Sequence, residues 1–219
     1  MSEFVRGDAV EVDRPLRDKL TDAIERLPPE NVPLSVALDL IGREGLLVLC
    51  VFLVLPFMVP ISIPGVSTVF GACILLIGLS VMLKRKLWLP DRLMNRTVPT
   101  GRLRMALEKG SVWLKRVEGL SRPRWRVLAH GSVMTRFNGF KLAIAALLLM
   151  APLGFVPLSN TLPGLAILFL SVGILQRDGG LILLGYVTNM VTIGYFTALI
   201  WSGGHAAREV IEHIVGVFT

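Results

Sequence analysis

The sequence lacks charge over long stretches. No Asp, Glu, Lys, Arg or His occurs in 45–83, 142–176 or 179–204. The first of these runs has 39 residues, and a helix that crosses a bilayer needs roughly 20. Charged residues make up 18% of the 219-residue chain and hydrophobic residues 53%. This composition excludes an ordinary soluble globular protein and predicts a multi-pass membrane protein whose main surroundings are the lipid bilayer.

Cysteine and histidine are scarce as well. Cys50 and Cys73 both lie in the first uncharged run, where thiols behave as small apolar groups, and a disulfide between them is not expected. The three histidines, at 130, 205 and 213, are too scattered to give the spacing of metal ligands. Because the runs also lack acid–base side chains, we predict no catalytic residue, no metal, no cofactor and no enzymatic activity.

The charges that are present are distributed unevenly. Residues 1–44 contain six basic and ten acidic residues, whereas residues 84–141 contain fifteen basic and three acidic ones. A basic excess beside membrane spans marks the cytoplasmic side. The central connection is therefore predicted to be cytoplasmic, in a protein of the bacterial inner membrane. Nothing in it is typical of a nucleic-acid-binding module, and no cleavable signal peptide is visible in the first 40 residues.

Three prolines interrupt each of the two longest runs. Proline removes a backbone donor and clashes with the preceding helical turn, so each run is expected to fold back as a broken helical hairpin. The backbone groups that this frees cannot face lipid and must face protein or a polar cavity. The expected arms are 45–59 and 67–83 in the first hairpin, and 140–156 and 161–176 in the second.

We predict an all-α integral membrane fold with two proline-broken hairpins, one C-terminal transmembrane helix and amphipathic interfacial helices. The expected segments are a polar tail (1–33), an interfacial helix (34–44), the first hairpin (45–83), a basic amphipathic connection (84–137), the second hairpin (138–178), the transmembrane helix (179–204) and a short amphipathic tail (205–219).

The two hairpins match one another at a spacing of 93 residues. This spacing aligns Pro64 with Pro157, Ser67 with Asn160, Thr68 with Thr161, Gly71 with Gly164 and Lys84 with Arg177. We interpret the match as an internal duplication, and transporters built from repeats bind substrate where their broken helices meet. Basic residues at the mouths of both hairpins favour a parallel arrangement of the two repeats. The alternative is an inverted arrangement, in which re-entrant hairpins enter the membrane from opposite faces.

The paired breaks are the candidate binding site. Helix N-termini favour an anionic group, so the expected ligand is an anionic lipid headgroup or a small anion. Alternatively, the hydroxyl and amide side chains satisfy the broken backbone, and Gly71, Gly78, Gly164 and Gly173 are expected to allow close helix packing. The candidate binding residues are Pro64, Ser67, Thr68, Gly71, Asn160, Thr161, Pro163 and Gly164.

The charged residues at the mouths form a second candidate set. Arg85, Arg177 and Asp178 are expected at a rim or gate, with an ion pair between the last two. Alternatively, Arg177 and Asp178 belong to a solvated turn that ends a helix, with Gly179 as its cap. The run 84–86 is interpreted as an anchor that stops membrane insertion.

The order of four motifs resembles the bacterial exopolysaccharide synthesis ExoD family of small integral membrane proteins. The resemblance covers about residues 34 to 200. The motifs are Gly-Arg-Glu-Gly (42–45), Pro-Ile-Ser-Ile-Pro-Gly-Val-Ser-Thr (60–68), Leu-Lys-Arg-Lys-Leu-Trp-Leu-Pro (83–90), and Asn-Thr-Leu-Pro-Gly (160–164) continuing to Leu-Gln-Arg-Asp-Gly (175–179). The resemblance implies a role in exopolysaccharide production and no particular reaction. Family members often have Gly where Lys84 stands here.

Two functions follow as hypotheses. The first is a small transporter or flippase-like protein, expected to be a homodimer, with its polar site at the paired breaks. The alternative is a non-transporting scaffold or accessory factor that organises exopolysaccharide assembly through the basic central connection.

Overall fold

The structure is a computed structural model. It describes residues 31–58, 65–85, 97–101, 131–151 and 158–218, together with a few single residues between 87 and 156. Side chains of the last helix are described as far as Ser202. The predicted amphipathic connection falls largely outside the described residues, as do the tail 1–30 and the prolines at 60, 64, 152 and 157.

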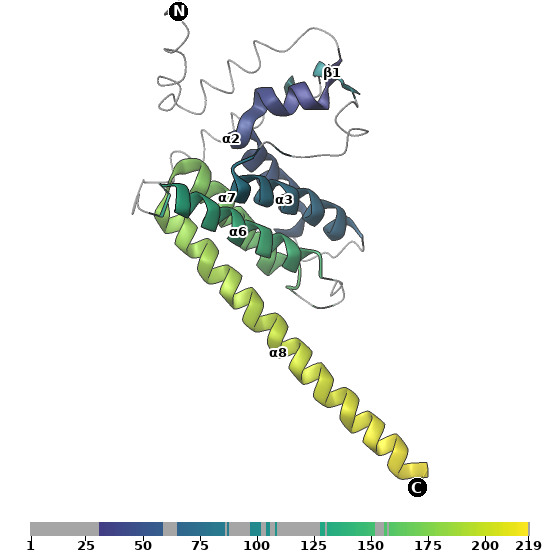
Figure 1. Ribbon diagram of the computed structural model, residues 1–219. Helices are drawn as coiled ribbons and strands as arrows, with labels where there is room; N and C mark the ends of the chain where they lie inside the picture. Colours follow the sequence, from purple (N-terminus) through teal and green to yellow (C-terminus); the bar gives the residue numbers. More distant parts are fainter. Residues whose placement is uncertain are drawn as a thin grey trace, which may run out of the picture.

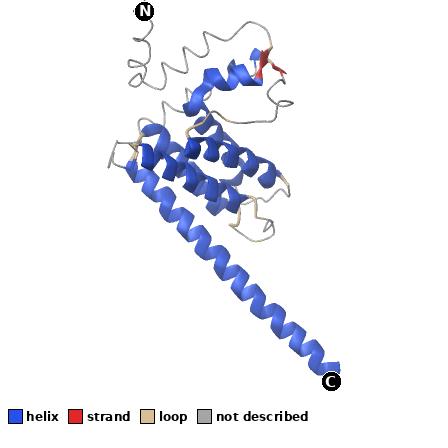
Figure 2. Ribbon diagram, in the orientation of Figure 1, coloured by secondary structure: helices blue, strands red, loops and turns tan. Residues whose placement is uncertain are grey.

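The described chain is helical apart from one short strand pairing (Figure 2). This confirms the all-α fold. Strands β1 (Val32–Pro33) and β2 (Thr97–Val98) pair antiparallel, with Val32 opposite Val98. The helices are α2 (Leu34–Val54), the 3-10 helix η2 (Leu55–Met58), α3 (Val66–Leu83), α6 (Ser132–Leu149), α7 (Thr161–Gln176) and α8 (Gly179–Phe218).

Among the described residues, three helical segments are long and apolar enough to cross a membrane. They are α3, α6 and the Gly179–Ser202 part of α8. Helix α7 is apolar but has only 16 residues, about 24 Å at 1.5 Å per residue. The lengths and composition therefore fit a membrane protein whose hairpins combine spanning and shorter arms.

Glycine and proline set the bounds of the first hairpin. Helix α2 covers the predicted interfacial segment and the start of the first arm. A kink at Gly42 divides it into two helical parts, because Gly42 has φ 64° and ψ −171°, a conformation open essentially to glycine alone. The regular helix ends at Val54, and Pro56 lies in the 3-10 turn that follows. The α-helical part of the arm is therefore shorter than the expected 45–59. Helix α3 agrees with the expected 67–83 to within one residue.

The first arm of the second hairpin lies earlier in the sequence than expected. Helix α6 occupies 132–149, whereas the pattern predicted 140–156. Its end has a local cause, because Pro152 disfavours helical geometry in the residue before it. Its start lies inside the segment assigned to the basic connection, so Arg136 belongs to this helix. The second arm, α7, begins and ends where the sequence predicted.

Helices α2, α3, α6 and α7 form a four-helix bundle (Figure 1). The main partner of α3 is α6, and the main partner of α2 is α7, so each hairpin is held chiefly by the other. Both pairs are antiparallel. Near the start of α3, Gly71 lies against Met150, just after the end of α6; near the start of α7, Gly164 lies against Val54 and Met58.

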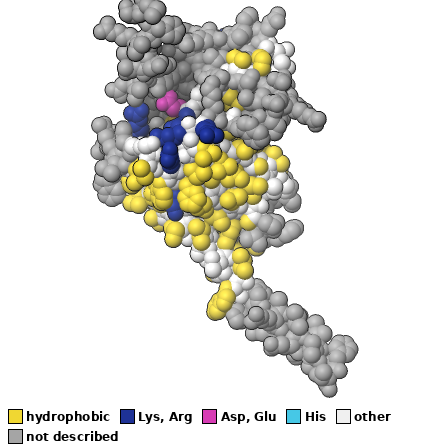
Figure 3. Space-filling view, in the orientation of Figure 1, with side chains coloured by type: hydrophobic (Ala, Val, Ile, Leu, Met, Phe, Trp, Pro, Cys, Tyr) yellow, Lys and Arg dark blue, Asp and Glu magenta, His cyan; other side chains and the backbone are white. Residues whose placement is uncertain are grey.

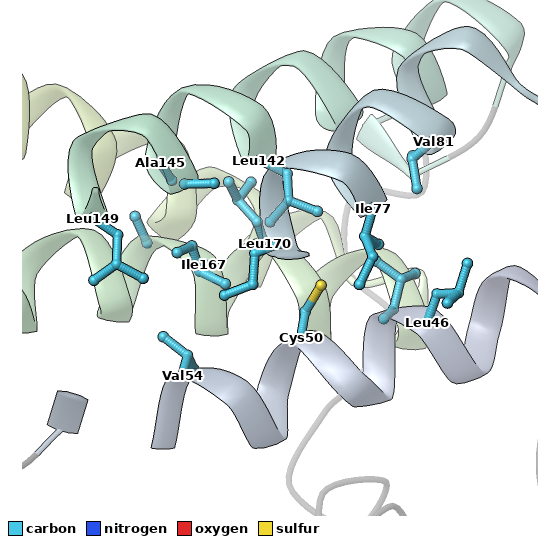
Figure 4. Close-up of a cluster of buried hydrophobic side chains, with 14 of the residues drawn as sticks. Leu46, Cys50, Val54, Ile77, Val81, Leu142, Ala145, Leu149, Ile167 and Leu170 are labelled. Atoms are coloured by element: carbon cyan, nitrogen blue, oxygen red, sulfur yellow. The ribbon is translucent and has the colours of Figure 1, made fainter. Parts of the chain in front are cut away.

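Buried side chains from all four helices point into one interior (Figure 4). Lipid is as apolar as these side chains, so van der Waals packing, rather than removal from water, favours their burial within a membrane. The residues labelled in Figure 4 are Leu46, Cys50, Val54, Ile77, Val81, Leu142, Ala145, Leu149, Ile167 and Leu170.

Glycines allow the closest helix contacts, as predicted for Gly78 and Gly173, and Gly139 adds a contact that was not predicted. A Cβ atom at Gly139 would lie 2.4 Å from the backbone nitrogen of Met82, and one at Gly78 would lie 2.9 Å from that of Ala143. The backbones of α3 and α6 are therefore almost in contact. A Cβ atom at Gly173 would lie 2.7 Å from the backbone nitrogen of Ile182, which brings α8 equally close to α7.

Helix α8 packs along the outside of the bundle and then extends beyond it (Figure 1). Gly173 faces Ile182, and Leu170 faces Gly185, so α8 runs antiparallel to α7. Its opposite face is apolar and exposed, as expected for a surface in contact with lipid. The exposed residues are Leu183, Leu184, Val187, Met190, Val191, Ile200 and Trp201.

Two glycines with open space around them should respond to alanine in opposite directions. Gly65 has φ 85°, whereas Gly194 is inside α8, and neither would bring a Cβ atom within 4 Å of a neighbour. We expect Gly65→Ala to lower the free energy of unfolding by about 1 kcal/mol, because Cβ clashes in the left-handed region. Gly194→Ala should raise it by roughly 0.5–1 kcal/mol through helix propensity. SDS denaturation in mixed micelles, followed by circular dichroism, measures the change in free energy of unfolding for each variant. Changes of the same sign in the two variants would contradict the backbone conformations assigned to the two glycines.

Candidate functional site

The two breaks end in the same local geometry. Gly65 precedes α3 with φ 85°, and Leu158, 93 residues further on, has φ 64°. The carbonyl of Gly65 accepts a hydrogen bond from the amide of Val69 at 3.3 Å, and that of Leu158 accepts one from Leu162 at 3.0 Å. Each second arm thus starts from a left-handed residue whose carbonyl begins the helical hydrogen bonds.

Polar side chains at the breaks are partly buried. Ser67 and Asn160 occupy matching places and are 9% and 6% exposed. Thr68 is exposed and Thr161 half-buried, while Pro163 is buried in the first turn of α7. Proline is tolerated there because the first amides of a helix have no intrahelical partner. Pro64 lies outside the described residues.

The two glycines of the candidate site contact neighbouring helices. A Cβ atom at Gly71 would lie 2.4 Å from Cγ of Met150, and one at Gly164 would lie 2.8 Å from Cε of Met58. Because α3 pairs with α6 and α7 pairs with α2, each break is packed against the opposite hairpin. The structure places both breaks at one end of the bundle, each with its own set of neighbours.

The rim residues lie at the other end of the bundle, where α3 and α7 terminate. Lys84 and Arg177 both adopt the left-handed conformation, with φ 53° and 52°. The next amides, of Arg85 and Asp178, donate to the carbonyls of Ser80 and Gly173 at 3.1 and 2.9 Å. These are Schellman-type helix ends. Arg177 rather than Gly179 is therefore the cap of α7, which corrects the alternative weighed from the sequence.

Asp178 is a capping residue at the start of α8. Its side chain is buried, and its carboxylate Oδ1 accepts a hydrogen bond from the amide of Gly180 at 2.9 Å. A carboxylate there also interacts favourably with the positive end of the helix. Arg85 and Arg177 are exposed.

Three polar residues that join α6 to α8 were missed in the sequence: Asn138 and Asn189, which are buried, and Tyr186, which is half-buried. Tyr186 donates a short hydrogen bond to Oδ1 of Asn138, whose Nδ2 donates to the carbonyl of Leu128 at 3.0 Å. Nδ2 of Asn189 donates to the carbonyl of Lys141 at 2.9 Å. The sequence did contain a signal for these contacts, namely an asparagine within an apolar helical stretch. The side-chain amide of such an asparagine usually faces another helix.

The described residues hold no group of three or more His, Cys, Asp or Glu side chains that could bind a metal ion, and both cysteines are free. The polar groups that do converge are amides, hydroxyls and helix ends. Such groups bind ligands or join helices through hydrogen bonds, and none of them is a strong acid or base.

The fold and these sites define a small all-helical membrane protein. The sequence profile of the family described as "Exopolysaccharide synthesis, ExoD" matches residues 16–198. The chain belongs to this family. It is 46% identical over 200 residues to Protein ExoD of Rhizobium meliloti, covering 91% of this chain and 83% of that protein.

A second relative is an uncharacterised protein of Synechocystis. It is 34% identical over 160 residues, covering 72% of each chain. No solved structure matches this chain. The family is linked by its name to exopolysaccharide synthesis, and the apolar helices of this chain are compatible with a membrane location.

Proposed function

We propose that this protein acts in exopolysaccharide production as a small transporter or flippase-like protein of the bacterial inner membrane, with its polar site at the two helix breaks. The observation that carries the proposal is the matched pair of breaks. A buried polar residue, Ser67 or Asn160, follows a left-handed residue at the start of an apolar helix in each. In transporters built from repeats, paired helix starts of this kind bind substrate through their free amides and nearby polar side chains.

An internal duplication is supported by geometry at both ends of the second arms. The left-handed residues at the start, Gly65 and Leu158, and at the end, Lys84 and Arg177, share the spacing of 93. Burial follows the same spacing. Each buried residue of α3 except Val81 has a buried counterpart 93 residues later, the pairs being Ser67 and Asn160, Gly71 and Gly164, Ile74 and Ile167, Ile77 and Leu170, Gly78 and Ser171, and Ser80 and Gly173.

The packing supports a parallel arrangement of the two repeats. In the proposed repeat, α2 corresponds to α6 and α3 corresponds to α7. The antiparallel pair of α3 with α6 therefore corresponds to the antiparallel pair of α7 with α2. Lys84 and Arg177 end matching helices, and Lys84 lies beside Ser132 at the start of α6. Both hairpins thus open towards a basic end, which we assign to the cytoplasm together with the central connection.

A scaffold for exopolysaccharide assembly is the second candidate, and one observation favours it. Gly71 and Gly164, one turn inside the breaks, are packed against Met150 and Met58. Tight contacts of this kind are expected where broken helices serve only to join two hairpins. On this reading, the basic connection binds the assembly machinery and the breaks are structural. Neither candidate assigns a chemical reaction to the chain.

The experiment compares substitutions at the two helix breaks with substitutions in the basic central connection. The break variant combines Thr68→Val with Asn160→Leu, the connection variant replaces Arg122, Arg124 and Arg126 by Gln, and Thr197→Val, an exposed threonine of α8, is the matched control. Proteoliposomes containing fluorescent phosphatidylglycerol report lipid movement through dithionite bleaching. Bacteria that carry each variant in place of the native gene report exopolysaccharide yield.

We expect the break variant to lose about ten-fold in both assays, since one missing hydrogen bond in a buried site is worth about 1.4 kcal/mol. The connection variant and the control should keep lipid movement. Normal lipid movement and yield in the break variant, with loss of yield in the connection variant alone, would reject the transporter and support the scaffold.

A further inference from the structure

Four basic side chains gather where the end of α3 meets the start of α6. They are Lys84, Arg85, Arg136 and Lys141; the first three are exposed and the last is half-buried. The close approach of the two backbones at Gly139 and Met82 holds this junction together. Figure 3 shows Lys and Arg side chains grouped at the edge of the hydrophobic surface.

Two of these cations flank one hydroxyl. Nζ of Lys84 donates to Oγ of Ser132 at 2.6 Å, and Arg136 is one helical turn beyond Ser132, on the same face of α6. Within a further turn, Nζ of Lys141 lies 5.3 Å from the centre of the Phe137 ring. Lys84 and Arg136 can therefore reach one ligand above Ser132.

The charges at this junction do not balance among the described residues. Helix α6 has no acidic residue in its first turn, so Lys84 and Arg136 lie beside the positive end of the helix. No described carboxylate is within salt-bridge distance of Lys84, Arg85, Arg136 or Lys141, whereas Arg104 is paired with Glu108 at 3.1 Å. Like charges this close repel one another, and an anion between them would relieve the repulsion.

The surface directly beside the cations is apolar. Leu83 precedes Lys84 and is 56% exposed, and Val133 follows Ser132 and is 74% exposed. Phe137 and Phe140 continue the same face of α6 at 41% and 47% exposure. A ligand that complements this surface has an anionic head next to the cations and hydrocarbon next to the aromatic rings.

We propose that the junction of α3 and α6 binds the phosphate headgroup of an anionic phospholipid. Lys84 and Arg136 contact the phosphate, and the acyl chains lie along Val133, Phe137 and Phe140. The site is at the opposite end of the bundle from the helix breaks, so it does not depend on the proposed transport function. It would hold the basic end of the bundle at the headgroup layer, where polybasic segments are attracted to anionic lipids.

The test is lipid retention by the purified full-length protein. Detergent-solubilised protein is mixed with phosphatidylglycerol or phosphatidylcholine, and bound lipid is counted by native mass spectrometry. We expect preferential retention of phosphatidylglycerol. Lys84→Gln with Arg136→Gln should weaken that retention about 25-fold, since each basic side chain near an anionic surface is worth about five-fold. Arg104→Gln, an exposed cation with a carboxylate partner, is the matched control.

Further arms separate the alternatives. Lys84→Arg with Arg136→Lys keeps both charges and should retain phosphatidylglycerol, which controls for misfolding of the neutral variant. Inorganic phosphate at 100-fold excess should not displace the lipid, because it lacks acyl chains; displacement would identify a free-anion site and overturn the proposal. Equal retention of the two lipids, or normal retention by the neutral variant, would overturn it as well. None of these readouts measures lipid movement or exopolysaccharide yield.

Discussion

Gly139→Leu is expected to lower the free energy of unfolding by about 3 kcal/mol, the upper end of the usual cost of overpacking. The reason is that the nearest neighbours of a Cβ atom at this position would all be backbone atoms of α3. It would lie 2.4 Å from the nitrogen of Met82 and 2.9 Å from the carbonyl oxygen of Gly78. Backbone cannot rotate away as a flexible side chain can, so α3 and α6 must separate.

Gly194→Leu is the matched control for this change. It adds the same side chain to a glycine in an apolar helix, where a Cβ atom would meet nothing within 4 Å. The free energy of unfolding of the control should not fall and should rise by roughly 0.5–1 kcal/mol, because leucine has a higher helix propensity than glycine. SDS unfolding in mixed micelles compares the two variants. Equal losses would mean that α3 and α6 are not in backbone contact at this point.

The same substitution should affect more than stability. The junction of Lys84, Ser132 and Arg136 lies at the end of the α3 and α6 contact, so separating the helices would also disperse the proposed phospholipid site. In a Gly139→Leu variant that remains folded, retention of phosphatidylglycerol should fall together with the free energy of unfolding. Gly78→Leu acts on the same interface, where its Cβ atom would lie 2.9 Å from the backbone nitrogen of Ala143. Its effect should therefore not add fully to that of Gly139→Leu.

Asn138→Ala is expected to lower the free energy of unfolding by about 2–3 kcal/mol. Asn138 is 1% exposed, accepts a hydrogen bond from Tyr186 and donates one to the carbonyl of Leu128 at 3.0 Å. Truncation leaves both partners without this amide, and an unsatisfied buried polar group costs roughly 1–3 kcal/mol. The amide also ties α8 to the end of the central connection, so its loss should loosen two contacts at once.

A double-mutant cycle isolates the contact between Asn138 and Tyr186. Tyr186→Phe alone should cost about 1 kcal/mol, in the range measured for hydrogen bonds between membrane helices. The double variant should be less destabilised than the sum of the two single changes, with a coupling of about 1 kcal/mol. Thr197→Val is the control, because the exposed hydroxyl of Thr197 bonds only within its own helix, to the carbonyl of Ile193 at 2.8 Å. Strict additivity would show that the amide and the phenol do not interact.

Much of the local structure could be predicted from the sequence. The absence of charge located the apolar helices, and Pro56 lies in the 3-10 turn that follows α2. Helix α7 has the predicted bounds, and α3 differs by one residue. These features depend on neighbouring residues: a charge is costly anywhere in the hydrocarbon layer, and proline disrupts a helix whatever surrounds it. The start of α6 was placed too late because its first turns carry Arg136 and Asn138, which weaken the apolar pattern.

The partners of the helices could not be predicted in the same way. An apolar helix in a membrane is hydrophobic on all sides, so its sequence pattern does not distinguish the face towards protein from the face towards lipid. The site residues illustrate this limit. Ser67 and Thr68 are adjacent and equally plausible in the sequence, yet the structure buries the first and exposes the second.

By itself, the sequence determined an all-helical protein of the ExoD family with helices apolar enough to cross a membrane. Tertiary structure alone decided that α3 pairs with α6, that Asn138 joins α6 to α8, and that Lys84 lies beside Ser132. The physical reason is that these contacts depend on close approach between segments about 50 residues apart in the chain. Glycine permits that approach, but the residues around a glycine do not specify which distant backbone will fill the space.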